Sequence, residues 1–150
     1  MNIGRRLFLR AGVALVALTA LPRTLLAAAW PESAFAATAS SGALIDLFGS
    51  DTTAETNQIK LTAPDIAENG AVVPLKVSTT LENVESISII VEKNPRPLAA
   101  TIEIPPGTLP EFSSRIKMRE TSDVMIAVKT NTGVFTTAKE IKVTIGGCGG

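Results

Sequence analysis

Residues 73–78 read Val-Pro-Leu-Lys-Val-Ser, with an apolar side chain at every second position. Successive side chains of a β-strand point to opposite faces of the sheet, so this alternation is typical of a strand that is buried on one face. The same period recurs downstream, at Ile87-Ile89-Val91, Ile102-Ile104, Ile116-Met118, Val124-Ile126-Val128 and Ile141-Val143-Ile145. The pattern predicts a domain that is built mainly from half-buried strands.

Turn-forming residues separate these runs at regular intervals. They are Glu68-Asn69-Gly70, Glu82-Asn83, Asn94-Pro95-Arg96-Pro97, Pro105-Pro106-Gly107 and Asn131-Thr132-Gly133. About seven short strands between residues 57 and 145 predict an all-β fold, an immunoglobulin-like antiparallel β-sandwich. A chain with a single cysteine cannot form the disulfide of antibody domains, so the prediction concerns the architecture alone.

A short helix is predicted in the segment 37–56, before the strands. Its apolar residues lie in the stretch 42–49, Gly-Ala-Leu-Ile-Asp-Leu-Phe-Gly. Ser40 or Ser41 is expected to cap its N-terminus, and Gly49 to end it. We expect this helix to pack on its own sandwich, and packing on a partner protein is the alternative.

The first 36 residues have the features of an export signal. Arg5 and Arg6 precede an apolar stretch from Ala11 to Leu21 that is too short to span a membrane. The arginine pair resembles the twin-arginine signal, which directs folded proteins to the bacterial periplasm. Cleavage sequences of the A-x-A type occur at 27–29 and at 34–36, and the second predicts a leader of residues 1–36. An ordinary secretion signal is the alternative, and it also places the mature protein outside the cytoplasm.

Composition excludes most kinds of catalytic site. The chain has no histidine and no tyrosine, which rules out nucleophiles activated by histidine and removes the commonest metal ligand. One cysteine cannot build a thiolate metal centre, so we expect neither a metal nor a cofactor. Removing four arginines and one glutamate with the leader leaves 10 basic and 13 acidic residues, which gives no reason to expect nucleic-acid or membrane binding. Cys148 is therefore the candidate for any chemistry.

Cys148 lies between two pairs of glycines, Gly146-Gly147 and Gly149-Gly150, at the end of the chain. The nearest basic residue in the sequence is Lys142, six positions away, so no neighbour activates the thiol. Glycines add no bulk and leave the backbone free, and three extended residues carry the sulfur roughly 10 Å beyond Ile145. The segment 146–150 is thus predicted to be a flexible, swinging arm that presents Cys148 to the active sites of other proteins.

The arginine pair, the β-patterned domain and the terminal Gly-Gly-Cys-Gly-Gly together resemble the SoxY-type thiosulfate carrier proteins of the periplasmic Sox sulfur-oxidising system. The resemblance implies that Cys148 carries sulfur intermediates covalently, as an S-thiosulfonate and as a persulfide, during thiosulfate oxidation to sulfate. It also implies a carrier with no catalytic residues of its own. The expected partners are a SoxZ-type β-sandwich subunit in a heterodimer, a haem c thiosulfate-conjugating enzyme, a sulfate-releasing thiohydrolase and a sulfane dehydrogenase.

Two other interpretations of the terminus remain. An extracytoplasmic structural or adhesive sandwich would use Cys148 for an intermolecular disulfide. A carrier that works through a thiocarboxylate on Gly150 needs activation in the cytoplasm, which the leader argues against. Prenylation is excluded because Cys148 is third, not fourth, from the end.

Overall fold

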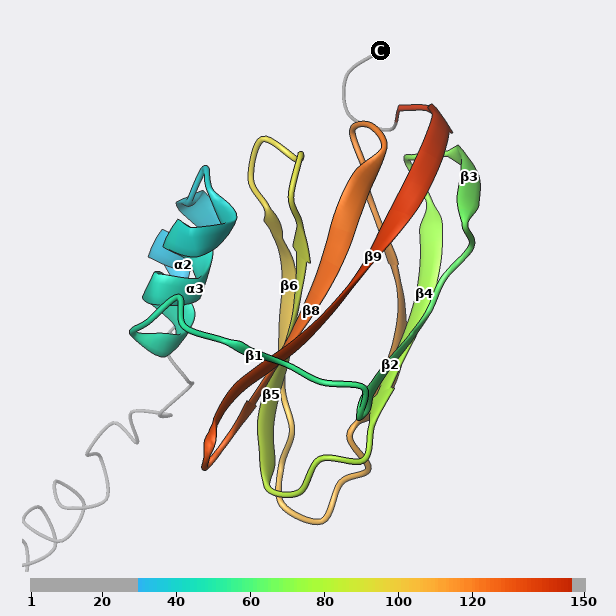
Figure 1. Cartoon of the computed structure of the whole chain (residues 1–150). Helices are drawn as coiled ribbons and strands as arrows, with labels where there is room; N and C mark the ends of the chain where they lie inside the picture. Colours follow the sequence, from blue (N-terminus) through green and yellow to red (C-terminus); the bar gives the residue numbers. More distant parts are fainter. Residues whose placement is uncertain (1–29, 147–150) are drawn as a thin grey trace, which may run out of the picture. The chain divides into compact units, whose positions relative to one another are not determined.

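The computed structural model describes residues 30–146, and residues 1–29 and 147–150 lie outside this part. The chain divides into two units after Trp30, and the unit that begins at Pro31 holds the elements shown in Figure 1. These elements are α2 (Glu32–Ala36), α3 (Ser40–Phe48), β1 (Ala54–Glu55), β2 (Ile59–Thr62), β3 (Ile66–Asn69), β4 (Val73–Thr79), β5 (Val84–Val91), β6 (Leu98–Glu103), β7 (Glu111–Ile116), β8 (Ser122–Thr130) and β9 (Gly133–Ile145).

The strands form two sheets, which confirms the predicted β-sandwich. One sheet has the order β1-β9-β8-β5-β6, with β3 also paired to β9, and the other has the order β2-β4-β7 (Figure 1). Seven of these strands pair antiparallel, as predicted, whereas β1 and β3 run parallel to β9. The two parallel strands were not predicted because two and four residues are too few to show a period.

Most of the predicted apolar rows meet between the two sheets. The fully buried members of this core include Val73, Val77, Ile87, Ile89, Val91, Val124, Ile126, Val128 and Ile141. The last row departs from the prediction, because Ile145 is 67% exposed. Ile145 is the last residue of β9. The strand β8 pairs with β9 only as far as Ile141, and beyond that residue β9 pairs with β3 alone. The end of β9 therefore extends past the strand that would cover it.

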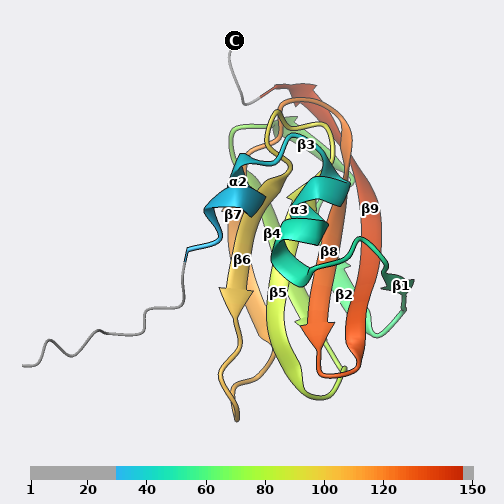
Figure 2. The ribbon, with the colours of Figure 1, turned by 90° about the vertical axis from the view of Figure 1, so that its left-hand side faces the viewer.

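The two helices bury the outer face of the larger sheet (Figure 2). Alternation along β5 puts Ile90 on the face opposite to Ile87, Ile89 and Val91, yet it is only 1% exposed, because it packs with Ala43 and Leu44 of α3 and with Ala127 of β8. The strands β5 and β8 are thus covered on both faces, which period-two alternation does not reveal. The contact confirms that α3 packs on its own sandwich.

The ends of α3 follow the prediction at one terminus only. Gly49 has a left-handed backbone (φ +78°) and donates its N–H to the carbonyl of Ile45 at 2.8 Å, as expected of a C-terminal glycine. The predicted serine caps are wrong, since Ala39 occupies the N-cap position. Ser40 and Ser41 already belong to the first helical turn, and in the described structure the buried Oγ of Ser40 has no hydrogen-bond partner.

The helix α2 was not predicted, because its five residues lie inside the segment assigned to the leader. Ala34 is fully buried and packs with the second apolar cluster, against which Phe35 and Ala37 also lie. α2 contacts both α3 and β6. Residues 32–36 are therefore part of the folded domain, and the predicted boundary at residue 36 falls at the end of a packed helix.

Candidate functional site

Of the residues predicted to form the site, only Gly146 lies in the described part of the chain. Cys148, Gly147, Gly149 and Gly150 follow it and lie outside, as do Arg5 and Arg6 of the predicted signal. What the structure describes is the place where the predicted arm leaves the domain. We call this place the arm root: Ile145 and Gly146, with the residues 70 and 117–119 that they adjoin and the side chain of Asn94.

The turn between β3 and β4 holds the end of β9. The buried Gly70 donates its N–H to the carbonyl oxygen of Ile145 at 2.7 Å. Its own carbonyl accepts the N–H of Met118, also at 2.7 Å, and Asn69 Oδ1 closes the turn by accepting the N–H of Ala71. The backbone of Gly70 therefore links the last residue of β9 to the connection between β7 and β8.

A side chain from the opposite loop fixes that connection. Asn94 Nδ2 donates to the carbonyl of Lys117 at 2.8 Å, and Asn94 Oδ1 accepts the N–H of Arg119 at 2.9 Å. Between these two residues Met118 is fully buried in the core. The N–H of Val143 also donates to Thr121 Oγ1 at 3.0 Å. Residues 117–121 are thus held from both sides, next to the end of β9.

Gly146 lies against this fixed backbone. A Cβ atom built on Gly146 would collide with the carbonyl oxygen of Arg119, although the residue is otherwise exposed. Its backbone is not in the left-handed region, so glycine is required here by space and not by conformation. By contrast, a Cβ atom built on Gly42 would come no closer than 3.6 Å to another atom of the described residues, and within 4 Å it would meet none of them at Gly49, Gly107 and Gly133.

In the folded domain two basic residues lie at the arm root, although their positions in the sequence did not associate them with the arm. Arg119 and Lys117 are exposed at the arm root, although they lie far from Cys148 in the sequence. Three ion pairs occur among residues 30–146, namely Lys76–Glu111, Lys129–Glu85 and Lys139–Asp65, and none involves these two side chains. Neither Arg119 nor Lys117 was predicted from the sequence as part of the site. Gly70 and Asn94 were assigned only to turns, because hydrogen bonds between loops leave no periodic signal in a sequence.

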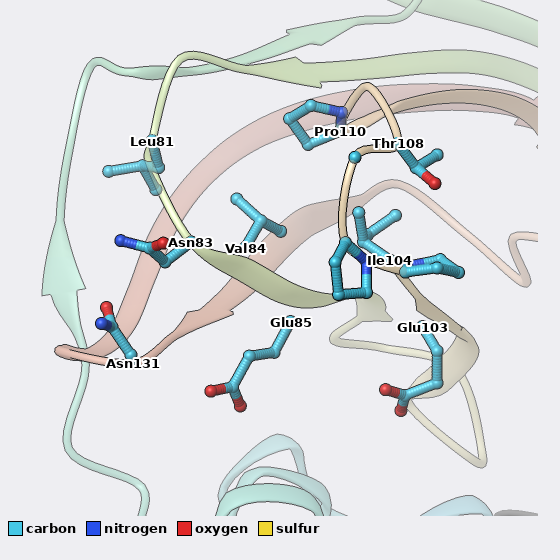
Figure 3. Close-up of a pocket in the computed structure, with 12 residues that line it drawn as sticks. Leu81, Asn83, Val84, Glu85, Glu103, Ile104, Thr108, Pro110 and Asn131 are labelled. Carbon is cyan, nitrogen blue, oxygen red and sulfur yellow. The ribbon is translucent and has the colours of Figure 1, made fainter.

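A hollow of about 770 Å³, whose lining residues are drawn in Figure 3, lies at the end of the sandwich opposite the arm root. It is lined by the loops that follow β4, β6 and β8, whereas the arm root follows the last residue of β9. Val84 and Ile104 face the hollow beside Leu81, while the carboxylates of Glu85 and Glu103 point the other way (Figure 3). Glu85 forms an ion pair with Lys129 at 3.0 Å. The hollow therefore lies at the opposite end of the sandwich from the arm root.

Residues 30–146 contain no group of three or more Cys, Asp or Glu side chains arranged to hold a metal ion. No helix in this part of the chain is long and apolar enough to cross a membrane.

Comparison with known proteins identifies the family. The family model of the sulfur oxidation protein SoxY matches residues 44–148, a range that covers the sandwich, the arm root and Cys148. The sulfur carrier protein SoxY from Chlorobium limicola f thiosulfatophilum is 36% identical, with a TM-score of 0.63 over 69% of this chain and 94% of that one. A PKD domain of an M14-like peptidase from Thermoplasmatales archaeon SCGC AB-540-F20 is 19% identical over 57% of this chain and 91% of its own, with a TM-score of 0.38. No curated protein matches the chain. The match over most of the chain and the similarity to the Chlorobium protein agree: the chain belongs to the SoxY family of sulfur oxidation proteins.

Proposed function

We propose that this protein is a sulfur carrier that holds intermediates of thiosulfate oxidation covalently on Cys148. The observation that carries the proposal is the position of this residue: the sole cysteine of a SoxY-family chain stands between two pairs of glycines, three residues after the end of β9 at Ile145. The similar Chlorobium protein is itself described as a sulfur carrier.

The proposed cycle has four steps. In the first, the Cys148 thiol and thiosulfate join through a new S–S bond, which releases one proton and passes two electrons to a haem c enzyme. In the second, water attacks the terminal sulfonate sulfur in the active site of a thiohydrolase, the bond from this sulfur to the next one breaks, and sulfate and a proton leave, so that a persulfide remains on Cys148. In the third, a sulfane dehydrogenase oxidises the outer persulfide sulfur to a sulfonate with three water molecules, which releases seven protons and passes six electrons to its electron acceptor. In the fourth, the thiohydrolase adds water, sulfate and a proton leave, and the Cys148 thiol is restored.

The carrier body would remain outside each active site while the arm enters. We propose that the body pairs with a SoxZ-type β-sandwich subunit in a heterodimer. The cost of ordering the arm at each encounter favours short contacts with several enzymes over one tight complex. This matches a protein that visits a conjugating enzyme, a hydrolase and a dehydrogenase in turn.

We propose that the protein works in the periplasm and reaches it as a folded chain by the twin-arginine route. Arg5 and Arg6 support this route. Replacing both arginines with lysine should retain the precursor in the cytoplasm, as cell fractionation would show.

The test is the variant Cys148→Ser. It should unfold at the same temperature as the wild type, because Cys148 lies beyond the packed domain, and it should abolish thiosulfate-dependent turnover with the partner enzymes. Full turnover by this variant would refute the proposal. Intact mass spectrometry of protein purified without reductant should show adducts of one sulfur atom or one thiosulfonate group on Cys148. A stable disulfide-linked homodimer without such adducts would favour the structural alternative.

A further inference from the structure

We propose that Gly146 is the fixed anchor of the arm and a positioning residue for Cys148, whereas the predicted swing begins only at Gly147. The sequence alone gives all four glycines the same role. The functional part of this inference rests on the carrier function proposed above, but its structural part does not.

The surroundings of Gly146 cannot give way easily. Gly146 faces the carbonyl of Arg119. The backbone of Arg119 is itself held in place, because its N–H donates to Asn94 Oδ1. The preceding residue, Met118, is fully buried and bonded to Gly70. On the other side, the carbonyl of Ile145 is bound by the N–H of Gly70 at 2.7 Å. Gly146 therefore directly follows one tethered residue, Ile145, and faces another, Arg119, so an added side chain would have to push these two backbones apart.

A fixed Gly146 limits the distance over which the Cys148 thiol can move and fixes the point from which the arm starts. Measured from Gly146, Cys148 lies two residues away, so its Cα stays within roughly 7 Å of a fixed point. A tether that is shorter by one residue confines the thiol to a smaller volume. This confinement raises the effective concentration of the thiol at an active site against which the body has docked. The anchor also keeps the starting point of the arm constant relative to residues 117–119.

The structural test compares Gly146→Ala with the matched control Gly147→Ala. Amide hydrogen exchange of Gly70, followed by NMR, reports directly on its bond to Ile145. We expect Gly146→Ala to raise this exchange rate by about tenfold, as loss of one hydrogen bond would, and Gly147→Ala to leave it unchanged. Equal exchange rates in both variants would overturn the proposal.

A nitroxide attached to Cys148, the only cysteine of the chain, gives a second readout. Electron paramagnetic resonance should show greater label mobility in Gly146→Ala than in the wild type. If Gly146→Ala does not fold, Asn94→Ala replaces it, because it frees the backbone of Arg119 while keeping the glycine. Asn94→Ala should likewise increase label mobility, and an unchanged spectrum would contradict the anchor.

The functional test measures turnover by the conjugating enzyme against carrier concentration. Gly146→Ala should raise the apparent KM several-fold with little change in kcat, while the reaction of Cys148 with a small thiol reagent keeps its rate. An unchanged KM would refute the positioning role. If Cys148→Ser still supports turnover, the carrier function fails, yet hydrogen exchange and label mobility continue to test the anchor.

Discussion

At the scale of single residues, Met118 joins the arm root to the core. Its side chain is fully buried, and its N–H is bonded to Gly70, which in turn holds Ile145. The sequence predicted Met118 as a core residue from its spacing to Ile116. It did not predict that the adjacent carbonyl, that of Arg119, faces Gly146, because this contact joins residues 27 positions apart in the chain.

Replacing Met118 with alanine should lower the free energy of unfolding by about 2–5 kcal/mol, since it leaves a cavity in the core. Urea denaturation measures the loss. Lys117→Ala is the control, because the side chain of Lys117 is exposed, and its effect should stay within about 0.5 kcal/mol. Equal effects of the two substitutions would show that residue 118 does not anchor this loop.

The ion pair between Asp65 and Lys139 should add a small pH-dependent stability. A hydrogen bond from Lys139 at 2.8 Å, with the charge of the same residue, lowers the pKa of Asp65 below its ordinary value of 3.8. A lowered pKa stabilises the fold above the pKa of the unfolded chain, and this contribution disappears as the pH falls through the folded value. It should be slight, because Asp65 is exposed.

Urea denaturation of wild type and Asp65→Asn on both sides of pH 3.8 checks this sign. The difference in stability between the two proteins should be larger above this pH and shrink below it. A difference that grows on acidification would contradict the assignment. Lys139→Met should remove the same pH dependence.

At the scale of elements, α2 and α3 turn the larger sheet into a layer that is covered on both faces. The buried Ile90 and Ala127 show where they pack. This cover extends to Ala34 and Phe35, which lie before the leader boundary at residue 36. Cleavage after Ala36 would remove both side chains from the apolar cluster.

We therefore predict that processing occurs at the first A-x-A sequence, residues 27–29, so that the exported protein begins at Trp30. N-terminal sequencing of the periplasmic protein checks this. A chain that begins at Ala37 should be less stable than one that begins at Trp30 by about 1.5–3 kcal/mol, the value of burying one Phe side chain. A native N-terminus at Ala37 with undiminished stability would contradict the prediction.

At the scale of the whole domain, β9 runs from the end of the sandwich that holds the hollow to the end that holds the arm root. Its 13 residues span about 40 Å at 3.3 Å per residue. The hollow of Figure 3 lies where β9 begins, and the arm root lies where it ends. Because the arm leaves the fold after its last fixed contact, stability and delivery of sulfur should depend on different parts of the chain.

Deleting residues 147–150 should leave the free energy of unfolding within about 0.5 kcal/mol of the wild type, because the last strand ends before them, at Ile145. Deleting residues 145–150 should cost about 1–3 kcal/mol more, because the buried N–H of Gly70 then loses its acceptor. Thermal or urea denaturation separates the two results. Equal stability of both truncated chains would show that Ile145 does not tie down the end of β9.

The β-sandwich, most of the core and the candidate residue for chemistry are predictable from the sequence. Alternating apolar residues and turn residues are local signals, and the absence of histidine can be read without a structure. Three features become visible only in the folded chain: α2 belongs to the domain, Ile90 is buried, and Gly146 lies against the carbonyl of Arg119. Each of these depends on contacts between residues far apart in the chain, such as Gly146 against Arg119, and spatial proximity of that kind is created only when the strands pair and pack.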